Sequence, residues 1–152
     1  MWSTRSSVTV DRPIHDVFRF LAEGRNNPIW RSDVCLAARI VGTGADLDVG
    51  ATFLQKVTDR SGRTVDETYE ITKYEPPHQL EFAARRGSSR TLGRFTLVAL
   101  DPGTTHVEFT LRPASRDHRV RGRRDYRCRL QGRVDSIAGL PAAMEDEGAL
   151  PL

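Results

Sequence analysis

Two polar residues, Gln55 and Glu67, interrupt a face of the sequence that is otherwise apolar. Strict alternation along the expected strands places both side chains on the same face as Tyr69, away from the charged residues between them. An unpaired carboxylate is costly in an apolar interior. Glu67 therefore either lines an internal cavity, where a carboxyl group can donate or accept a proton, or lies at the rim beside an arginine such as Arg127 or Arg133. A one-residue bulge that reverses the alternation is a third interpretation.

Seven strands must position this pair. Alternating apolar and polar residues predict them at 5–10, 34–41, 51–59, 64–74, 79–86, 91–100 and 105–112. Short turns separate the last six, which favours an antiparallel arrangement because parallel pairs need longer crossovers. The sheet then has one charged face and one apolar face, and the apolar face needs a cover.

Helical spacing predicts the elements that supply this cover. A short amphipathic helix is expected from Ile14 to Leu21, and a second short turn or helix carries Trp30. The segment 115–147 returns to helical spacing, and Gly139 and Pro141 predict a kink or break in it near 139–141.

Length and composition indicate one globular domain that spans residues 1–152. The chain is 38% hydrophobic and 28% charged, which excludes collagen-like, disulfide-knotted and fully disordered proteins. Its apolar runs are far shorter than the roughly 20 residues of a membrane helix, so we expect no membrane insertion. The first residues lack the apolar run of a signal peptide, which favours the cytoplasm. The oligomeric state is open, and a homodimer is one alternative.

An Arg-rich segment, residues 112–133, stands out from the rest of the chain. It holds nine Arg against two Asp, while the whole chain has a formal net charge of only +3. Such a segment can attract phosphates or anionic surfaces. Equally, it can be a solvated helix face whose arginine stems cover apolar surface. Nucleic-acid binders usually add several aromatic stacking residues, and only Tyr126 lies here, so we do not expect nucleic acid as the partner.

No metal or cofactor is expected. The four histidines show no metal-ligand spacing, and the two cysteines are far apart in the sequence. The glycines at 42 and 44 are typical of a turn, since a dinucleotide-binding fingerprint needs a strand, glycines and a helix in order.

Several motifs, in this order and spacing, resemble the START-like, or SRPBCC, superfamily and in particular its bacterial polyketide cyclase/dehydrase-like members. The resemblance covers about residues 6–113 and, more loosely, the terminal helix. The motifs are the opening stretch 7–22, Asn26-Asn-Pro-Ile-Trp30, Val49-Gly-Ala-Thr-Phe53, the stretch 69–80 around Glu75-Pro-Pro-His78, and Gly103-Thr-Thr-His-Val107.

The resemblance implies an α+β helix-grip fold. In it a curved seven-stranded antiparallel sheet wraps around a long C-terminal helix, with two short helices after the first strand. An elongated apolar cavity between sheet and helix would bind a hydrophobic small molecule of the lipid, polyketide or quinone kind. The chain departs from the pattern at Gly139-Leu-Pro141 and in the Arg-rich segment, and both departures affect the helix side of this cavity.

Three functions follow as alternatives. The first is binding of a hydrophobic molecule without chemistry. The second is a cofactor-free cyclase or dehydratase, in which Glu67 acts as general acid or base and Tyr69 and Gln55 orient the substrate. The third is binding of a protein or RNA partner through the Arg-rich segment. The expected ligand-contacting residues are Trp30, Phe53, Gln55, Tyr69, Phe82, Phe95, Phe109, Tyr126 and Leu130.

Overall fold

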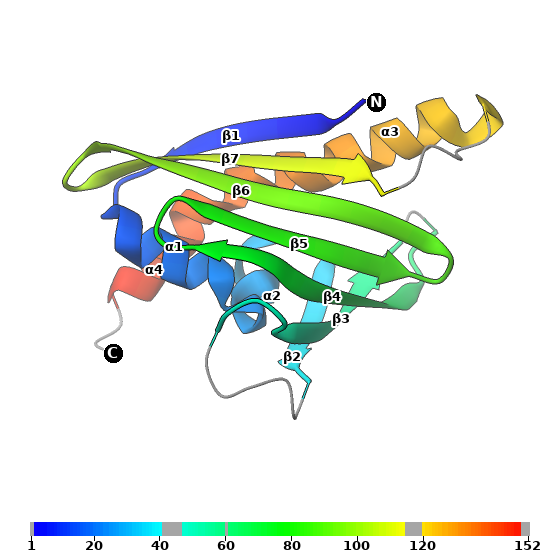
Figure 1. The fold of residues 1–152 in the computed structure, drawn as a ribbon, viewed down its shortest axis with the longest axis horizontal. Coiled ribbons are helices and arrows are strands. Elements are labelled where there is room, and N and C mark those ends of the chain that lie inside the picture. Colours follow the sequence, from blue (N-terminus) through cyan, green and yellow to red (C-terminus); the bar gives the residue numbers. More distant parts are fainter. Residues whose placement is uncertain (1, 41–46, 60, 115–119, 150–152) are drawn as a thin grey trace.

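A single antiparallel sheet of seven strands forms the body of the molecule (Figure 1). The structure is a computed structural model that describes residues 2–40, 47–59, 61–114 and 120–149. The strand order is β1-β7-β6-β5-β4-β3-β2, so β1 and β2 are the two edges. The strands are β1 (Thr4–Val10), β2 (Val34–Arg39), β3 (Thr52–Thr58), β4 (Thr64–Glu75), β5 (Gln79–Arg86), β6 (Ser89–Asp101) and β7 (Thr104–Pro113).

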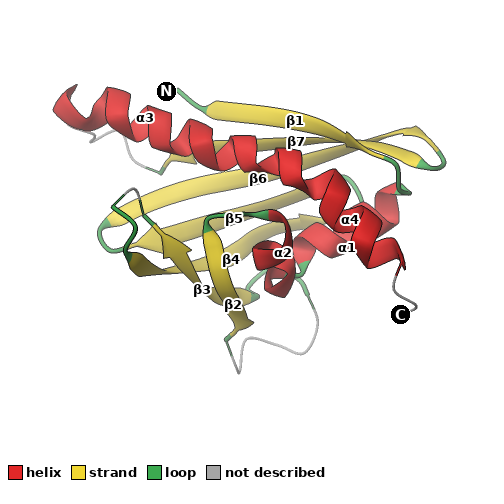
Figure 2. Cartoon of the chain, turned by 180° about the vertical axis from the view of Figure 1, so that it is seen from behind, coloured by secondary structure: helices red, strands yellow, loops and turns green. Residues whose placement is uncertain are grey.

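The helices lie against one face of the curved sheet (Figure 2). After β1 come α1 (Ile14–Ala22), a 3₁₀ turn η1 (Gly24–Asn26) and the single turn α2 (Asn27–Trp30). The C-terminal segment forms α3 (Val120–Asp135), a 3₁₀ turn η2 (Ser136–Gly139) and α4 (Leu140–Ala149), which follow one another across the sheet. The expected α+β helix-grip fold with seven strands is therefore confirmed.

The terminal helix is interrupted slightly earlier than the sequence predicts. The irregular turn occupies Ser136–Gly139, and Pro141 lies in the first turn of α4, where its missing N–H is tolerated. A side chain at Gly139 would collide with the carbonyl oxygen of Trp30. Because residue 139 has no side chain, the end of η2 and the start of α4 lie close to α2.

Aromatic rings fill the space between the sheet and the helices. Phe95 stacks on Phe109 with ring centroids 4.4 Å apart, and Phe53 stacks on Tyr69 at 5.2 Å. Phe82 joins the two pairs, with its centroid 5.3 Å from that of Tyr69 and 6.0 Å from that of Phe95. The helices contribute buried apolar side chains to the same core, namely those of Leu130, Val134, Ile137 and Leu140. Among the described residues, no helix has the length and apolar character required to cross a membrane.

The ring of Phe82 fits over Gly93 of the neighbouring strand, since a Cβ atom at Gly93 would overlap it. We expect Gly93→Ala to lower the free energy of unfolding by about 1–3 kcal/mol because of overpacking. The control Gly132→Ala, in α3 with nothing within 4 Å of its Cβ position, should instead raise it by roughly 0.5–1 kcal/mol. Urea denaturation measures both. In Phe82→Ala/Gly93→Ala, the combined loss should be smaller than the sum of the single losses, and strict additivity would contradict the assigned packing.

Candidate functional site

Gln55 and Glu67 are direct partners across β3 and β4, and both side chains are buried. The register is regular at this point, so the bulge interpretation is wrong. Gln55 Nε2 donates a hydrogen bond of 2.6 Å to Glu67 Oε1. The alternation argument therefore placed both residues on the correct face.

Asn27 of α2 extends the hydrogen bonds of this pair. Asn27 Nδ2 lies 3.1 Å from Gln55 Oε1 and 3.1 Å from Tyr69 Oη, and donates to both. Burial raises the pKa of Tyr69 well above its ordinary value of 10.0, although the hydrogen bond from Asn27 lowers it. The Tyr69 phenol therefore stays protonated near neutral pH and is not a general base.

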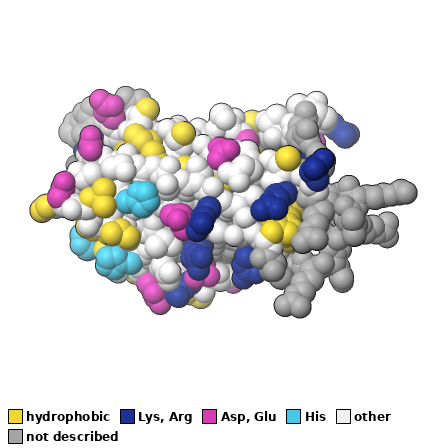
Figure 3. All heavy atoms as spheres, turned by 90° about the horizontal axis from the view of Figure 1, so that it is seen from above, with side chains coloured by type: hydrophobic (Ala, Val, Ile, Leu, Met, Phe, Trp, Pro, Cys, Tyr) yellow, Lys and Arg dark blue, Asp and Glu magenta, His cyan; other side chains and the backbone are white. Residues whose placement is uncertain are grey.

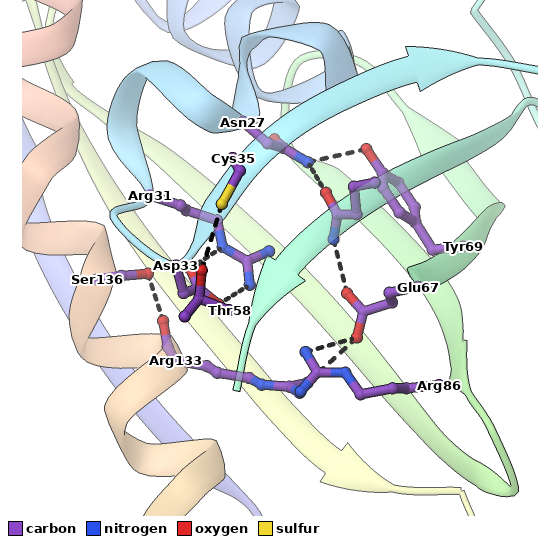
Figure 4. A network of polar contacts seen from close by, with 11 residues as sticks. Asn27, Arg31, Asp33, Cys35, Thr58, Glu67, Tyr69, Arg86, Arg133 and Ser136 are labelled. Atoms are coloured by element: carbon purple, nitrogen blue, oxygen red, sulfur yellow. Dashed lines mark hydrogen bonds and ion pairs between the residues drawn. The ribbon is translucent and has the colours of Figure 1, made fainter. Parts of the chain in front are cut away.

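Two arginines hold the other oxygen of the carboxylate (Figure 4). Arg133 Nη1 of α3 lies 3.4 Å from Glu67 Oε2, and Arg86 Nη2 at the end of β5 lies 3.2 Å from the same atom. The pairing with Arg133 is as predicted. The rim location that accompanied this prediction is wrong, because the Glu67 side chain is only 4% exposed. The alternative partner, Arg127, instead lies over the ring of Trp2 at 5.6 Å.

A second ion pair lies beside the first. Arg31 donates from Nε and Nη2 to the two carboxylate oxygens of Asp33, at 3.2 and 2.9 Å. Burial alone would raise the pKa of Asp33, but the charge and hydrogen bonds of Arg31 outweigh it and hold this pKa below 3.8. Asp33 is therefore ionised at neutral pH. We call Arg31, Asp33, Glu67, Arg86 and Arg133 the charged cluster.

The charged cluster lies between two spaces of very different size. Inside it is a cavity of about 20 Å³, enough for about one water molecule. Its walls include Asn27, Trp30, Arg31, Gln55, Tyr69, Phe82 and Phe95. On the other side a cleft of about 360 Å³ opens between the sheet and α3. The cleft is lined by Ser32, Asp33, Thr58, Asp59, Arg86, Cys128, Arg129, Gly132, Arg133 and Ser136.

The predicted ligand-contacting residues cluster in the interior. Of these, Trp30, Gln55, Tyr69, Phe82 and Phe95 line the small cavity, whereas Phe53, Phe109 and Leu130 are buried in the packed core. Tyr126 on α3 is half-buried, with its hydroxyl 3.0 Å from Thr91 Oγ1. Within the described residues, the elongated apolar cavity implied by the resemblance is reduced to this small volume, because the aromatic rings fill the space.

Four residues of the site, Asn27, Arg31, Asp33 and Arg86, were not among the predicted ones. For Arg86 the sequence does carry a signal. Along β5 it follows Leu80, Phe82 and Ala84 on the buried face of the strand, as Glu67 follows the buried face of β4. An arginine and a glutamate that share an apolar face on neighbouring strands favour an internal ion pair.

The sequence of this chain matches one known protein family. The profile of the family described as "Polyketide cyclase / dehydrase and lipid transport" matches residues 1–135. The chain belongs to this family. No curated protein matches the sequence. The polyketide cyclase/dehydrase family assignment agrees with the START-like resemblance of the sequence motifs.

Solved structures share the fold of this family member at low sequence identity. The chain is similar to TTHA0849 from Thermus thermophilus, with 16% identity, a TM-score of 0.76, and 96% and 99% of the two chains covered. It resembles the Zhui aromatase/cyclase from Streptomyces sp. R1128, with 15% identity, a TM-score of 0.72, and 97% and 93% covered. Against the di-domain ARO/CYC BexL from the BE-7585A biosynthetic pathway, identity is 16% and the TM-score 0.74. There 95% of this chain is covered but only 47% of the di-domain, so this chain spans about half its length.

The Arg-rich segment has more than one structural role. Its residues 115–119 lie outside the described part of the chain, and of the described arginines Arg133 points inward to Glu67. Arg127 and Arg129 lie over the aromatic rings of Trp2 and Tyr126. In the view onto β1, β6 and β7, the drawn basic side chains are interspersed with acidic ones (Figure 3). These three described arginines thus contact other parts of the same chain, two of them through cation–π contacts and one through an ion pair.

Replacing Glu67 by Gln tests the charged cluster. The substitution leaves Arg86 and Arg133 without a counter-ion, so we expect the free energy of unfolding to fall by about 3–5 kcal/mol in urea denaturation. The matched control is Asp66→Asn, the preceding residue, whose pair with Lys56 is exposed. It should cost less than about 1 kcal/mol. Equal losses in the two variants would contradict the assignment.

Acidification tests the pair between Arg31 and Asp33. Because the pKa of Asp33 is lower in the folded protein than its ordinary 3.8, the pair stabilises the fold above that pH. This contribution is lost as the pH falls through the folded-state pKa. We expect Asp33→Asn and Arg31→Gln each to flatten the acid limb of the plot of unfolding free energy against pH. Curves parallel to that of the unsubstituted protein would rule the contribution out.

Proposed function

We propose that the protein binds a small molecule in the cleft between the sheet and α3, with Asp33, Arg86 and Arg133 of the charged cluster as the floor of the site. The observation that carries this proposal is the cleft of about 360 Å³ on Arg86 and Arg133. This volume falls within the range of roughly 300–1,000 Å³ typical of ligand pockets. The interior cavity of about 20 Å³ is too small for an organic ligand.

The composition of the floor favours a ligand with a polar group. Arg86 and Arg133 are fixed by their shared contact with Glu67, so their positive charge is already in place before a ligand arrives. Small residues, Gly132 and Ser136, line the cleft from the helix side and leave room for the rest of the molecule. The family description supports a hydrophobic body for that molecule, of the lipid or polyketide kind.

A cofactor-free cyclase or dehydratase is the second candidate, favoured by the family description and by fold neighbours named aromatase/cyclase. The contacts of Glu67 argue against it as a proton donor. All its partners, Gln55, Arg86 and Arg133, are donors, so its oxygens only accept. Glu67 also lines neither the inner cavity nor the cleft, so it does not directly face a molecule bound in either space. Noncatalytic binding is therefore the function that the site supports best.

A tryptophan placed in the cleft tests the proposal. Nothing lies within 4 Å of the Cβ position of Gly132, so Gly132→Trp fills the cleft without a clash at its base. Gly103→Trp, in the turn between β6 and β7, is the control. Native mass spectrometry of proteins purified from the original host should show a bound small molecule in the unsubstituted protein and in Gly103→Trp, and its loss in Gly132→Trp. Equal recovery of the molecule from all three would overturn the cleft as the site.

A further inference from the structure

The charged cluster lacks one negative charge. Arg31 and Asp33 neutralise each other through two hydrogen bonds. Arg86 and Arg133 share the single carboxylate of Glu67, and both approach the same oxygen. Three guanidinium groups thus face two carboxylates, and one positive charge is left over. Uncompensated charge in a partly buried site is costly, so the cluster attracts an anion.

Arg86 also lacks hydrogen bonds. Its Nε and Nη2 atoms are buried and make none, because the 3.2 Å approach to Glu67 is an ion pair without hydrogen-bond alignment. The charged form of Arg133 is likewise disfavoured by its surroundings. Burial lowers the pKa of Arg133 from its ordinary value, and the neighbouring positive charges of Arg86 and Arg31 lower it further, against the attraction of Glu67 and Asp33. Glu67 alone therefore does not satisfy the two arginines.

The side chains of Arg86 and Arg133 reach the cleft, although Nε and Nη2 of Arg86 are themselves buried. The side chains of Arg86 and Arg133 are 24% and 18% exposed, and both line the cleft, whereas the Arg31 side chain is only 7% exposed and lines the inner cavity. An anion that enters the cleft therefore meets Arg86 and Arg133 together. The cleft wall also holds Asp59, which disfavours a second negative charge, and Arg129, whose guanidinium group lies over the ring of Tyr126. A single anionic group on an otherwise uncharged body fits this arrangement.

We propose that the ligand is a monocarboxylate whose carboxylate binds between Arg86 and Arg133, with Glu67 as the fixed counter-ion behind them. This inference rests on the proposed function, since it names the chemical class of the molecule that the cleft takes. Arginine suits this role because its guanidinium group stays charged and donates strong charge-assisted hydrogen bonds to a carboxylate.

A matched pair of probes tests the inference on the intact protein. 2-Naphthoate and 2-naphthalenemethanol have the same ring system, and only the first is charged. Isothermal titration calorimetry should give an affinity at least about tenfold higher for the naphthoate. Amide chemical shifts of Gly132 and Ser136 report whether each probe enters the cleft.

Two variants on adjacent residues identify the anchor. Arg86→Gln removes the surplus charge and should abolish the preference for the naphthoate, while binding of the alcohol changes less than about twofold. Arg85→Gln is the control, because Arg85 is exposed on the opposite face of β5 and the change in net charge is the same. It should keep the full preference. Arg133→Gln should act like Arg86→Gln, and circular dichroism checks that each variant is folded.

The outcomes separate the two proposals. If both probes bind in the cleft with equal affinity, or if Arg85→Gln and Arg86→Gln behave alike, the carboxylate inference is wrong and the cleft remains a binding site. If neither probe binds or shifts the cleft amides, both the inference and the proposed function fail.

Discussion

The carboxylate of Glu67 is buried inside a curved sheet, and a carboxylate in that position requires positive charge beside it. The charge comes from two distant parts of the chain, Arg86 at the end of β5 and Arg133 on α3. One buried residue therefore ties the sheet to the terminal helix. The two ion pairs hold α3 in place across the strands, and the cleft opens between α3 and the sheet beside them.

The same requirement explains why polar residues accumulate here. Gln55 satisfies the first oxygen of Glu67, and Asn27 in turn satisfies the carbonyl oxygen of Gln55, so α2 is held to β3 by side-chain hydrogen bonds. Each group in this chain is buried and would be costly without its partner. The polar residues thus form a continuous boundary between the aromatic interior and the cleft.

The fold could be predicted from sequence largely because period-two alternation is a local signal. Strand β5 was expected at 79–86 and is found there, and the Gln55–Glu67 pair faces the interior as alternation requires. The site was predicted only in part. The pairing of Glu67 with Arg133 could be proposed as one option, but the inward position of Arg86 depends on which face of β5 packs against the interior. The size of a cavity depends on packing that alternation does not describe, such as the ring of Phe82 seated over Gly93.

That packing decides where a ligand can bind. An aromatic-rich apolar face is typical both of a ligand cavity and of a solid core, and only the fit of the rings separates the two. Here Phe82 contacts both stacked pairs, so the rings pack against one another and leave a cavity of only about 20 Å³. A cleft of about 360 Å³ lies instead on the charged side of the boundary, against Arg86 and Arg133. At the proposed site, recognition depends first on the charge of Arg86 and Arg133, because the residues that line the cleft are mostly polar and the aromatic rings are packed in the core.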